Sequence, residues 1–490
     1  MAVAPRFDVS IDGREYLVDI ERYRRSTVPA QKQQQDTSDD VGEQTLSNVG
    51  QWIRSQSDWS RGAGQEHYDL VDSDRRRFHT SKNVDVWTKG HLSICKALES
   101  KQAAGTNTNL YARIVNGSVF YFSDGSDMKY GNPDAAPTIT FSASAQGGTI
   151  KDWTSDGSQI YSCIGTAVKK VAVSSTSGAS TIGSFAGDVI EFANGRLISA
   201  DGARIVELNS SGTVLTFDKT LTGTCIAIKG GPQRIYAAYN VNGQGILYSI
   251  GISSTDGALA YPVPAAVLPV GETFSGPFCL DIFGSMVIAG TSAGCRFGVI
   301  STQDNASITF GPVVDDGGAA YGTRIVGKYG YWGTSNGDTW KADLTVFNDV
   351  LQPAYARFLA HDSDTYGNVL SLEVVNGKLF FTDSNGELYG EDYSGDLSTS
   401  AELIVGQVTF GTSASKVARA VSGRFANEQA ESGSGDIDYR VSGTDYRTST
   451  LNYRGLTAGV TGTTTITLTD ENNVSTAMVL TGTGVETAYS

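Results

Sequence analysis

The stretch that decides the fold is Leu372-Glu373-Val374-Val375-Asn376-Gly377-Lys378-Leu379-Phe380-Phe381-Thr382-Asp383-Ser384-Asn385-Gly386. It holds a β-like run, an Asn-Gly turn, a second β-like run that ends in a small residue, and another turn. Asn-Gly between two such runs is a strong signal for a tight β-hairpin. The stretch therefore predicts two antiparallel strands, with a turn leading to a third.

The same unit recurs along the chain. Residues 113–125 and 189–202 repeat it clearly, and weaker copies contain residues 159–162, 234–237, 286–289 and 330–333. The small residue that closes the second run falls at positions 123, 162, 199, 237, 289, 333 and 382, and (382 − 123)/6 gives a mean period of about 43. Periods of ~40–50 residues with several short strands are typical of β-propeller blades. Seven copies predict a seven-bladed propeller over about residues 84–395.

A propeller must also join its first and last blades, because an open sheet edge invites aggregation. Strands from both ends of the repeat region are the natural means. We therefore expect residues 84–87 or 92–95 to pair beside the last blade, near residues 379–389.

The composition agrees with an all-β chain. Glycine supplies 57 of 490 residues, above the usual ~7%, and tyrosine and phenylalanine together number 22 + 19 = 41. Lys+Arg 37 against Asp+Glu 52 gives a net charge of −15, which disfavours nucleic acid or an anionic membrane as a partner. No apolar run approaches the ~18 residues of a transmembrane helix, and the opening residues lack the apolar core of a secretory signal.

The N-terminal region differs from the repeats in its charge. The first hundred residues hold 30 charged residues and the other 390 hold 59, about half that density. Runs at residues 7–11 and 16–20, separated by Asp12-Gly13, predict a hairpin. The polar stretch 30–40 has too little to bury and should be disordered by itself. We therefore interpret residues 1–83 as an extended docking arm, of which residues 15–75 lie against other subunits.

The repeat ends near residue 395, and residues 400–490 carry a different set of strands. Runs at 408–410, 416–421 and 437–441 precede two runs, 463–468 and 477–480, that face each other across residues 470–473. Five or more short strands in this length predict a small C-terminal β-sandwich.

The least generic segment lies at residues 52–87, where tryptophans alternate with charges and turn glycines. Aromatic and arginine density in a segment too irregular to form its own core suits a docking surface. Packing on the propeller itself is an equally good interpretation, and both can hold. The candidate docking residues are Trp52, Arg54, Trp59, Arg61, Gln65, Arg75, Arg76, Arg77, Phe78 and Trp87. We interpret Arg75–Arg77, flanked by Asp72 and Asp74, as an ion-pairing surface.

This segment resembles the N-terminal region of minor tail proteins from long-tailed (siphovirus-type) actinobacteriophages. The resemblance rests on Trp52 followed by Ser57-Asp58-Trp59-Ser60-Arg61-Gly62-Ala63-Gly64-Gln65, and then on the run Arg77-Phe78-His79-Thr80-Ser81-Lys82-Asn83-Val84-Asp85-Val86-Trp87. It covers about residues 15–95 in motif and the rest only in architecture. It implies a structural virion component at the distal tail, assembled with other tail proteins in the host cytoplasm. Contact with the host envelope is a further expectation from the resemblance.

Motifs of catalysis are weak. Residues 290–294 match G-x-S-x-G, but β-like runs flank them where a nucleophile elbow requires a following helix. A second match at 333–337 lies 43 residues later, one repeat onward, so both predict turns. The end of residues 335–340 resembles an Asp-box, itself a turn motif. We therefore predict that the chain is not an enzyme; the alternative is a propeller that binds or hydrolyses carbohydrate.

Signals for metals and cofactors are equally sparse. The four histidines and five cysteines are scattered without metal-ligand spacing, and the thiols predict buried, unpaired cysteines. Residues 315–318 and 362–364 lack the full spacing of a calcium loop, so solvated turns are expected. No cofactor is predicted. Loop tyrosines such as Tyr130, Tyr321 and Tyr366 suit stacking on sugars of a host glycan, although packing between blades is the simpler role.

Overall fold

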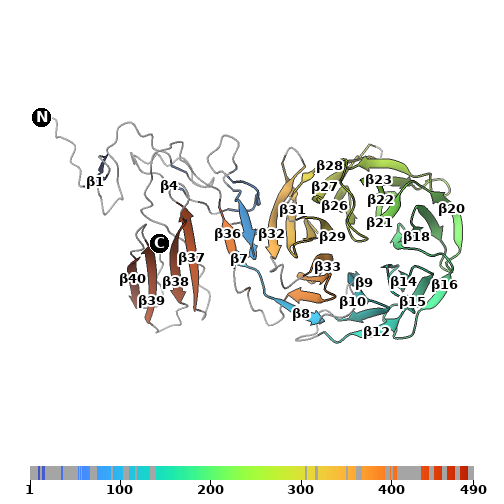
Figure 1. Ribbon diagram of the computed structural model, residues 1–490, viewed down its shortest axis with the longest axis horizontal. Helices are drawn as coiled ribbons and strands as arrows, with labels where there is room; N and C mark the ends of the chain where they lie inside the picture. The colour runs from blue at the N-terminus through green and yellow to red at the C-terminus, as the bar shows by residue number, and fades with distance from the viewer. Residues whose placement is uncertain are drawn as a thin grey trace. The chain divides into compact units, whose positions relative to one another are not determined.

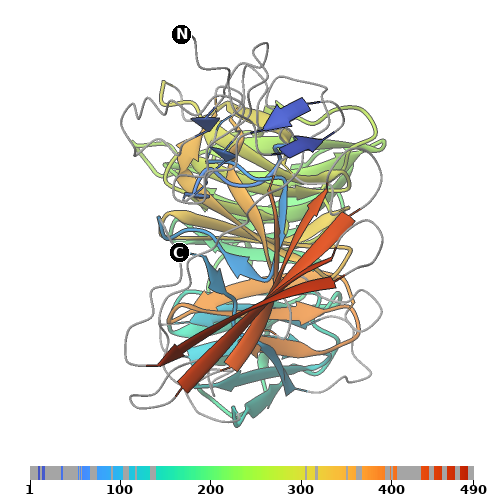
Figure 2. The ribbon, with the colours of Figure 1, turned by 90° about the vertical axis from the view of Figure 1, so that its left-hand side faces the viewer.

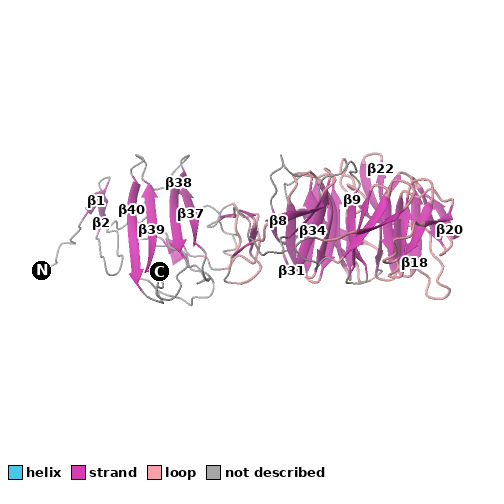
Figure 3. Cartoon of the chain, turned by 90° about the horizontal axis from the view of Figure 1, so that it is seen from below, coloured by secondary structure: helices cyan, strands magenta, loops and turns pink. Residues whose placement is uncertain are grey.

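The structure is a computed structural model of the chain. It describes residues 9–11, 14–16, 35–36, 53–54, 56, 58–66, 74, 76–89, 92–102, 110–115, 119–132, 139–303, 306–314, 318–348, 351–359, 367–391, 398, 401–405, 432–440, 446–454, 461–469 and 475–483. These residues form strands and loops and contain no helix (Figure 3). Contacts divide the chain into two compact units, Met1–Val408 and Thr409–Ser490.

Seven four-stranded antiparallel sheets form the blades of a β-propeller around a central axis (Figure 1). Blades 1 to 3 consist of β9 (Leu110–Val115), β10 (Val119–Asp124), β11 (Asp127–Gly131) and β12 (Ser142–Ala145); β13 (Asp152–Ser155), β14 (Gln159–Cys163), β15 (Val168–Ala172) and β16 (Ser180–Gly183); and β17 (Val189–Ala193), β18 (Arg196–Asp201), β19 (Arg204–Leu208) and β20 (Val214–Thr220). Blades 4 and 5 consist of β21 (Thr224–Gly231), β22 (Arg234–Val241), β23 (Gln244–Gly251) and β24 (Val263–Val267); and β25 (Leu280–Phe283), β26 (Met286–Thr291), β27 (Gly294–Ile300) and β28 (Ile308–Val313). Blades 6 and 7 consist of β29 (Ala320–Val326), β30 (Tyr329–Thr334), β31 (Thr339–Phe347) and β32 (Pro353–Leu359); and β33 (Val369–Val375), β34 (Lys378–Asp383), β35 (Leu388–Glu391) and β8 (Leu98–Gln102).

The seven-bladed prediction is confirmed, and the repeat has a structural cause. All seven small residues that mark the period lie on the second strand of a blade, from Ser123 on β10 to Thr382 on β34. Ser123, Ser162, Ser199, Ala237, Ala289 and Thr382 are completely buried. A second strand lies inside its sheet and is covered by a neighbouring blade on each face, so its apolar run stands out in the sequence.

The ring closes, as predicted, through a strand that precedes the first blade, but that strand is not one of the two predicted segments. β8, which precedes the first blade, pairs antiparallel with β35 and is the outermost strand of blade 7. Residues 84–87 and 92–95 do not pair with a strand of that blade; β6 (Val84–Asp85) pairs instead with β7 (Ser93–Ile94), although Cys95 joins an apolar cluster that includes residues of blade 7. The prediction chose the wrong segment because β8, Leu-Glu-Ser-Lys-Gln, has the polar pattern that an outer strand tolerates. The blade strands thus span Leu98–Glu391, inside the predicted range of 84–395.

Most blades share an irregularity in the pairing of their two outer strands. The register shifts between the third and fourth strands in six of the seven blades, as between Val206 and Leu208 of β19. A bulge adds local twist to a strand pair. The apolar cores lie between adjacent blades, where large rings such as Trp153 and Trp332 are completely buried.

The terminal regions are described in part. β1 (Val9–Ile11) and β2 (Arg14–Tyr16) form the hairpin predicted across Asp12-Gly13, although the second strand is earlier than the predicted 16–20. Within the polar stretch 30–40 the structure describes β3 (Gln35–Asp36), which runs parallel to β4 (Ile53–Arg54). The prediction of disorder for the rest of that stretch lies outside the described residues.

Among its described residues, the C-terminal unit contains an antiparallel sheet of four strands (Figure 2). Its strands are β37 (Ser432–Arg440), β38 (Tyr446–Arg454), β39 (Thr461–Thr469) and β40 (Ser475–Thr483). β39 and β40 form the hairpin predicted across residues 470–473, with Thr469 paired with Ser475. The predicted strands at 408–410 and 416–421, and with them a second layer of the sandwich, lie outside the described residues.

Candidate functional site

A lobe of non-propeller residues packs on the outer strand of blade 6 (Figure 1). We define the lobe as the described residues of 56–97 and 398–405. β5 (Thr80–Lys82) pairs with β36 (Glu402–Ile404), and the backbone N–H of His79 donates to the carbonyl of Ile404 at 2.8 Å. The chain that enters the propeller and the chain that leaves it are therefore hydrogen-bonded to each other.

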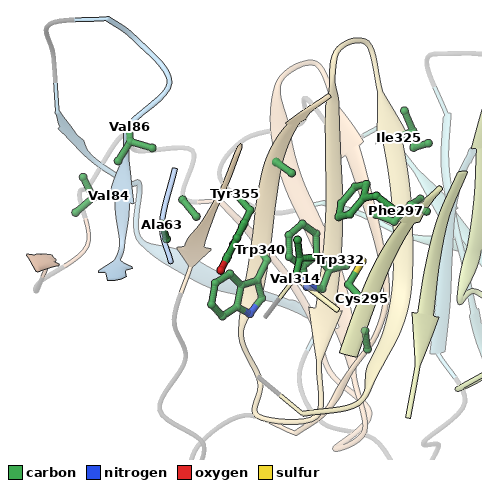
Figure 4. Close-up of a cluster of buried hydrophobic side chains, with 14 of the residues drawn as sticks. Ala63, Val84, Val86, Cys295, Phe297, Val314, Ile325, Trp332, Trp340 and Tyr355 are labelled. Carbon is green, nitrogen blue, oxygen red and sulfur yellow. The ribbon is translucent and has the colours of Figure 1, made fainter. Parts of the chain in front are cut away.

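The aromatic residues of the lobe bury themselves against blade 6. Phe78 is 0% exposed, and Trp59 and Trp87 pack against the same cluster. The blade supplies Trp332 and Trp340, whose rings stack at 6.0 Å between centroids and 9° between planes. Figure 4 shows Ala63, Val84 and Val86 of the lobe beside Tyr355 and Trp340 of the blade.

A glycine permits the closest approach between lobe and blade. The N–H of Ala63 donates to the carbonyl of Tyr355 at 2.6 Å. Gly62 has a φ of +82°, and a Cβ there would lie 2.5 Å from the Tyr355 backbone nitrogen. Both the backbone conformation and the contact therefore require glycine at this position.

The polar candidate residues satisfy one another within the lobe. Gln65 and Asp74 exchange two hydrogen bonds: the Gln65 amide donates to the Asp74 carbonyl at 2.9 Å, and the Asp74 N–H donates to Gln65 Oε1 at 2.7 Å. The Asp74 carboxylate pairs with Arg61 at 3.6 Å and with Arg76 at 3.3 Å. Arg77 donates to the carbonyl of Ala63 at 2.5 Å. The ion-pairing surface predicted here is thus partly an internal network.

A second set of contacts fixes β5 and β6 to the propeller. Lys341 Nζ lies 3.3 Å from a carboxylate oxygen of Asp85 and 4.4 Å from the ring centroid of Tyr329. Trp87 packs on the same tyrosine at 5.9 Å. Arg357 donates from Nε to the Ser81 carbonyl at 3.1 Å. A cation that lies between an aromatic ring and a carboxylate is attracted by both, and the attraction is stronger where water is excluded.

These contacts correct one prediction. Residues 15–75 were expected to lie against other subunits, but the described residues 58–66 and 74 belong to the lobe on their own propeller. The reason is that blade 6 offers a complementary aromatic surface more than 250 positions away in the sequence, which no local pattern reveals. Among the other candidates, Arg54 lies in β4, and Trp52 and Arg75 lie outside the described residues.

A second cluster, which the sequence analysis missed, lies on the innermost strands around the axis. We call it the axial layer, and it contains Arg113, Thr154, Glu191, Lys229, Asp281, Arg324 and Glu373, one residue from each blade. The signal was visible in the repeat, because the first β-like run of each clear copy contains one charged residue among apolar ones. Three cations and three carboxylates balance within this layer.

The charges of the axial layer form a chain of ion pairs from blade to blade. Arg324 contacts Glu373 at 2.9 Å and Asp281 at 3.5 Å. Lys229 lies 3.6 Å from Asp281 and 3.1 Å from Glu191.

Glu191 ends this chain at Arg113, at 2.8 Å. Burial alone would raise the pKa of Glu191, but the Lys229 and Arg113 cations outweigh it and hold that pKa below its usual value. The two cations therefore keep the Glu191 carboxylate ionised inside the ring.

Asp152 lies beside this chain as a fourth carboxylate. It is 1% exposed and lies 3.6 Å from Arg113, whose nearer partner is Glu191. It accepts hydrogen bonds from the backbone N–H of Trp153 at 2.8 Å and of Ile190, in the next blade, at 2.9 Å. Burial raises the pKa of Asp152 to about 7 against the opposing effect of Arg113.

An aromatic side chain covers the axial layer. Phe278, from the loop between blades 4 and 5, places its ring 4.4 Å from the guanidinium carbon of Arg113 on blade 1. Its carbonyl accepts the N–H of Thr323 at 2.8 Å, which fixes the loop to blade 6. Arg113 thus lies near two aromatic rings, those of Phe278 and Trp153, and pairs with two carboxylates. The cations of the layer are engaged by the protein's own groups.

The motifs considered for catalysis are turns. Residues 290–294 form the hairpin between β26 and β27, and residues 333–337 form the turn between β30 and β31. Tyr130 stacks on Tyr121 at 5.2 Å and donates to the carbonyl of Ser174, so it packs between blades. Residues 315–317 and 362–364, considered for calcium, lie outside the described residues. In the part of the chain that the structure describes, no three or more metal-ligating side chains gather.

The thiols are internal. Cys95, Cys163, Cys225, Cys279 and Cys295 are buried, as predicted, and form no disulfide bonds with one another. Burial raises the pKa of Cys163 and Cys225 well above its usual value, which keeps these thiols protonated and unreactive.

Comparison with known proteins identifies no family and gives only distant structural similarities. No protein-family model matches the sequence, and no curated protein matches it. Among solved structures, the chain is similar to the WD40 β-propeller domain of Doa1, with 10% identity, a TM-score of 0.45, and coverage of 62% of this chain and 100% of that one. It is also similar to BamB from Moraxella catarrhalis, with 11% identity, a TM-score of 0.38, and coverage of 62% and 99%. Within the described residues, no helix is long and apolar enough to cross a membrane.

Proposed function

We propose that the protein is a structural subunit of a phage tail, in which the lobe joins the propeller to neighbouring distal-tail subunits. The observation that carries the proposal is the lobe itself. Both ends of the propeller leave the ring there, through paired strands β5 and β36, so the propeller is a domain inserted between two attachment segments. The motif run of residues 52–87, which resembles minor tail proteins, supplies most of the lobe.

The outer surface of the lobe supports a contact role. Leu92, Ile94, Ile404 and Val405 are each about 40% exposed, at 41%, 42%, 41% and 39%. Four of the ten exposed large apolar residues of the described chain thus lie in this lobe, and exposed apolar surface favours a contact with a partner. Burial of the aromatic candidates against blade 6 makes the lobe a rigid platform for such a contact.

The test is the location of the protein in purified virions. Particles from a lysate are probed by immunoelectron microscopy with an antibody raised against the propeller. Label at the tail tip, together with the chain among the virion proteins by mass spectrometry, is the expected result. Its absence from intact tailed particles overturns the proposal.

We further propose that the chain binds host-surface glycan and does not cleave it. The axial carboxylates, where a propeller could hold an acid and base pair, are mostly committed to ion pairs with Arg113, Lys229 and Arg324. Many copies on one particle would compensate for weak binding at each. Incubation with host wall polysaccharide should give binding without new reducing ends; release that a single carboxylate substitution abolishes contradicts this.

A further inference from the structure

Asp152 lies where blade 2 meets blade 3 and shares its cation with a neighbouring carboxylate. One guanidinium nitrogen of Arg113, Nη1, donates to Glu191 Oε2 at 2.8 Å, whereas the other, Nη2, lies 3.6 Å from Asp152 Oδ1. The second distance is too long for a hydrogen bond. Glu191 has a further cation in Lys229 at 3.1 Å, but among the described residues Asp152 has only Arg113. Arg113 is therefore shared unequally between two carboxylates.

The charges around the axis balance only when Asp152 is left out. The axial layer holds three cations and three carboxylates in its chain of ion pairs. Asp152 adds a fourth carboxylate that is almost completely buried. An unpaired charge in the interior is costly, and a buried carboxyl avoids that cost by holding a proton. The geometry thus favours a protonated Asp152 as long as Arg113 stays on its nearer partner.

The other titratable groups around Asp152 do not supply the missing positive charge. Cys163 of β14 lies opposite Asp152 in the strand pairing, and Cys225 of β21 lies close enough to be affected by its charge. Burial raises the pKa of both thiols well above its usual value, so they stay neutral. Lys151, the preceding residue, is half-exposed and pairs with Asp188. The axial charges therefore govern whether Asp152 keeps its proton.

We propose that Asp152 and Arg113 form a proton-operated switch, whose two states differ in the carboxylates that the guanidinium binds. In one state Asp152 holds a proton and Arg113 donates to Glu191 alone. When Asp152 releases its proton to solvent, its carboxylate draws Arg113 Nη2 in from 3.6 Å, and the guanidinium bridges both carboxylates. Glu191 keeps its ion pair with Lys229, so it tolerates a weaker hold on Arg113.

The movement of Arg113 also reaches the residue that covers the axial layer. The rings of Phe278 and Trp153 lie 4.4 and 5.7 Å from the guanidinium carbon. A cation that shifts relative to two rings changes its attraction to both. The protonation state of a residue on blade 2 is thereby transmitted to the loop between blades 4 and 5, and Trp153 reports it. This inference is independent of the tail assignment.

The test is fluorine NMR of the full-length protein with fluorotryptophan at its six tryptophan positions, recorded from pH 5 to pH 9. The Trp153 resonance is identified by its loss in Trp153→Phe. We expect this resonance to shift with a midpoint of about pH 7, because burial raises the pKa of Asp152 to about 7. If none of the six resonances titrates in this range, the proposal is overturned without recourse to any variant.

Two substitutions distinguish a shared cation from burial alone. Asp152→Asn should abolish the shift of the Trp153 resonance. Glu191→Gln removes the competing carboxylate, so Arg113 should turn to Asp152 and lower the midpoint by about 1–3 pH units. A shift that persists in Asp152→Asn, or a Glu191→Gln midpoint equal to that of wild type, overturns the switch.

The matched control is Asp188→Asn. It removes a carboxylate close to Asp152 in the same pair of blades, but one that is partly exposed and paired with Lys151. We expect the midpoint of the Trp153 resonance to stay at its wild-type value in this variant. A midpoint that moves as far as in Glu191→Gln would assign the effect to the general field of nearby charges and would overturn the role of Arg113.

Discussion

Replacing Asp152 by asparagine is expected to change how the stability of the propeller depends on pH. Burial raises the pKa of this carboxyl from 3.8 to about 7. The folded protein therefore holds a proton that the unfolded chain releases near pH 4. The stability from this proton is complete below pH 3.8 and is lost as the pH rises through 7.

The magnitude follows from the size of the shift. From 3.8 to about 7 is 3.2 pH units, which at ~1.4 kcal/mol each is about 4 kcal/mol lost by wild type between acid and alkaline pH. Asparagine has no proton to lose. It has one acceptor oxygen where Asp152 accepts from both Trp153 and Ile190, so one backbone N–H loses its partner at a cost of ~1–3 kcal/mol.

The lost proton and the lost hydrogen bond together decide how the stability of the Asp152→Asn variant compares with that of wild type at each pH. At pH 9 the variant should be more stable than wild type by about 1–3 kcal/mol, the difference between the 4 gained and the 1–3 lost. Wild type loses stability only up to its folded pKa of about 7, so the loss within the measured range occurs between pH 5 and pH 7. Over these two pH units the unfolding free energy of the variant minus that of wild type should rise by about 3 kcal/mol.

The assay is urea unfolding at pH 5, 7 and 9, followed by tryptophan fluorescence, to which the neighbouring Trp153 contributes. The control is Asp218→Asn, which removes an exposed carboxylate whose hydrogen bond with Arg204 lowers its pKa. Stability from Asp218 is lost in acid, so this variant should show no rise toward alkaline pH. A difference for Asp152→Asn that is flat from pH 5 to 9 refutes the reasoning.

Three further substitutions test the axial layer and the lobe. Arg324→Met should lower the unfolding free energy by about 3–5 kcal/mol, because it leaves the buried Glu373 carboxylate without its cation; a wild-type urea midpoint contradicts the ion-pair chain. Phe78→Ala should cost about 3–5 kcal/mol of packing and let trypsin cut the lobe before the blades; an unchanged digestion pattern argues against lobe packing. Gly62→Ala should lower the melting temperature more than Gly195→Ala, since both have positive φ but only Gly62 meets backbone within 3 Å of a new Cβ; equal losses would show that conformation alone matters.

The sequence predicts those elements whose apolar pattern or turn residues lie within one short stretch of the chain. The second strand of every blade is apolar and preceded by a turn, so Leu379–Asp383 and its counterparts could be found by their period. The hairpin at Asp12-Gly13 and that between β39 and β40 followed from turn chemistry in the same way. Outer strands such as β8 carry no comparable pattern, because water on one side tolerates polar residues.

The candidate sites depend on partners that are distant in sequence. Phe78 and Trp59 are predicted as candidate docking residues, with packing on the propeller as the other interpretation, and the surface that receives them includes Trp340 and Tyr355. The axial layer poses the same difficulty: Arg113 and Glu191 are single charges within apolar runs, and only ring geometry brings them to 2.8 Å. Residue type predicted the need for a partner, and topology decided which partner it was.

The lobe also explains why the ring closes through β8. Residues 84–94 are engaged in the pairing of β6 with β7, and the Cys95 N–H donates to the carbonyl of Asn83 at 2.9 Å. The first strand free to join blade 7 therefore begins at Leu98. The Cys95 carbonyl in turn accepts the N–H of Ser398, on the segment that leaves blade 7. Entry, exit and closure strands are thus tied together within a few residues, so separating blade 7 from β8 also strains the lobe.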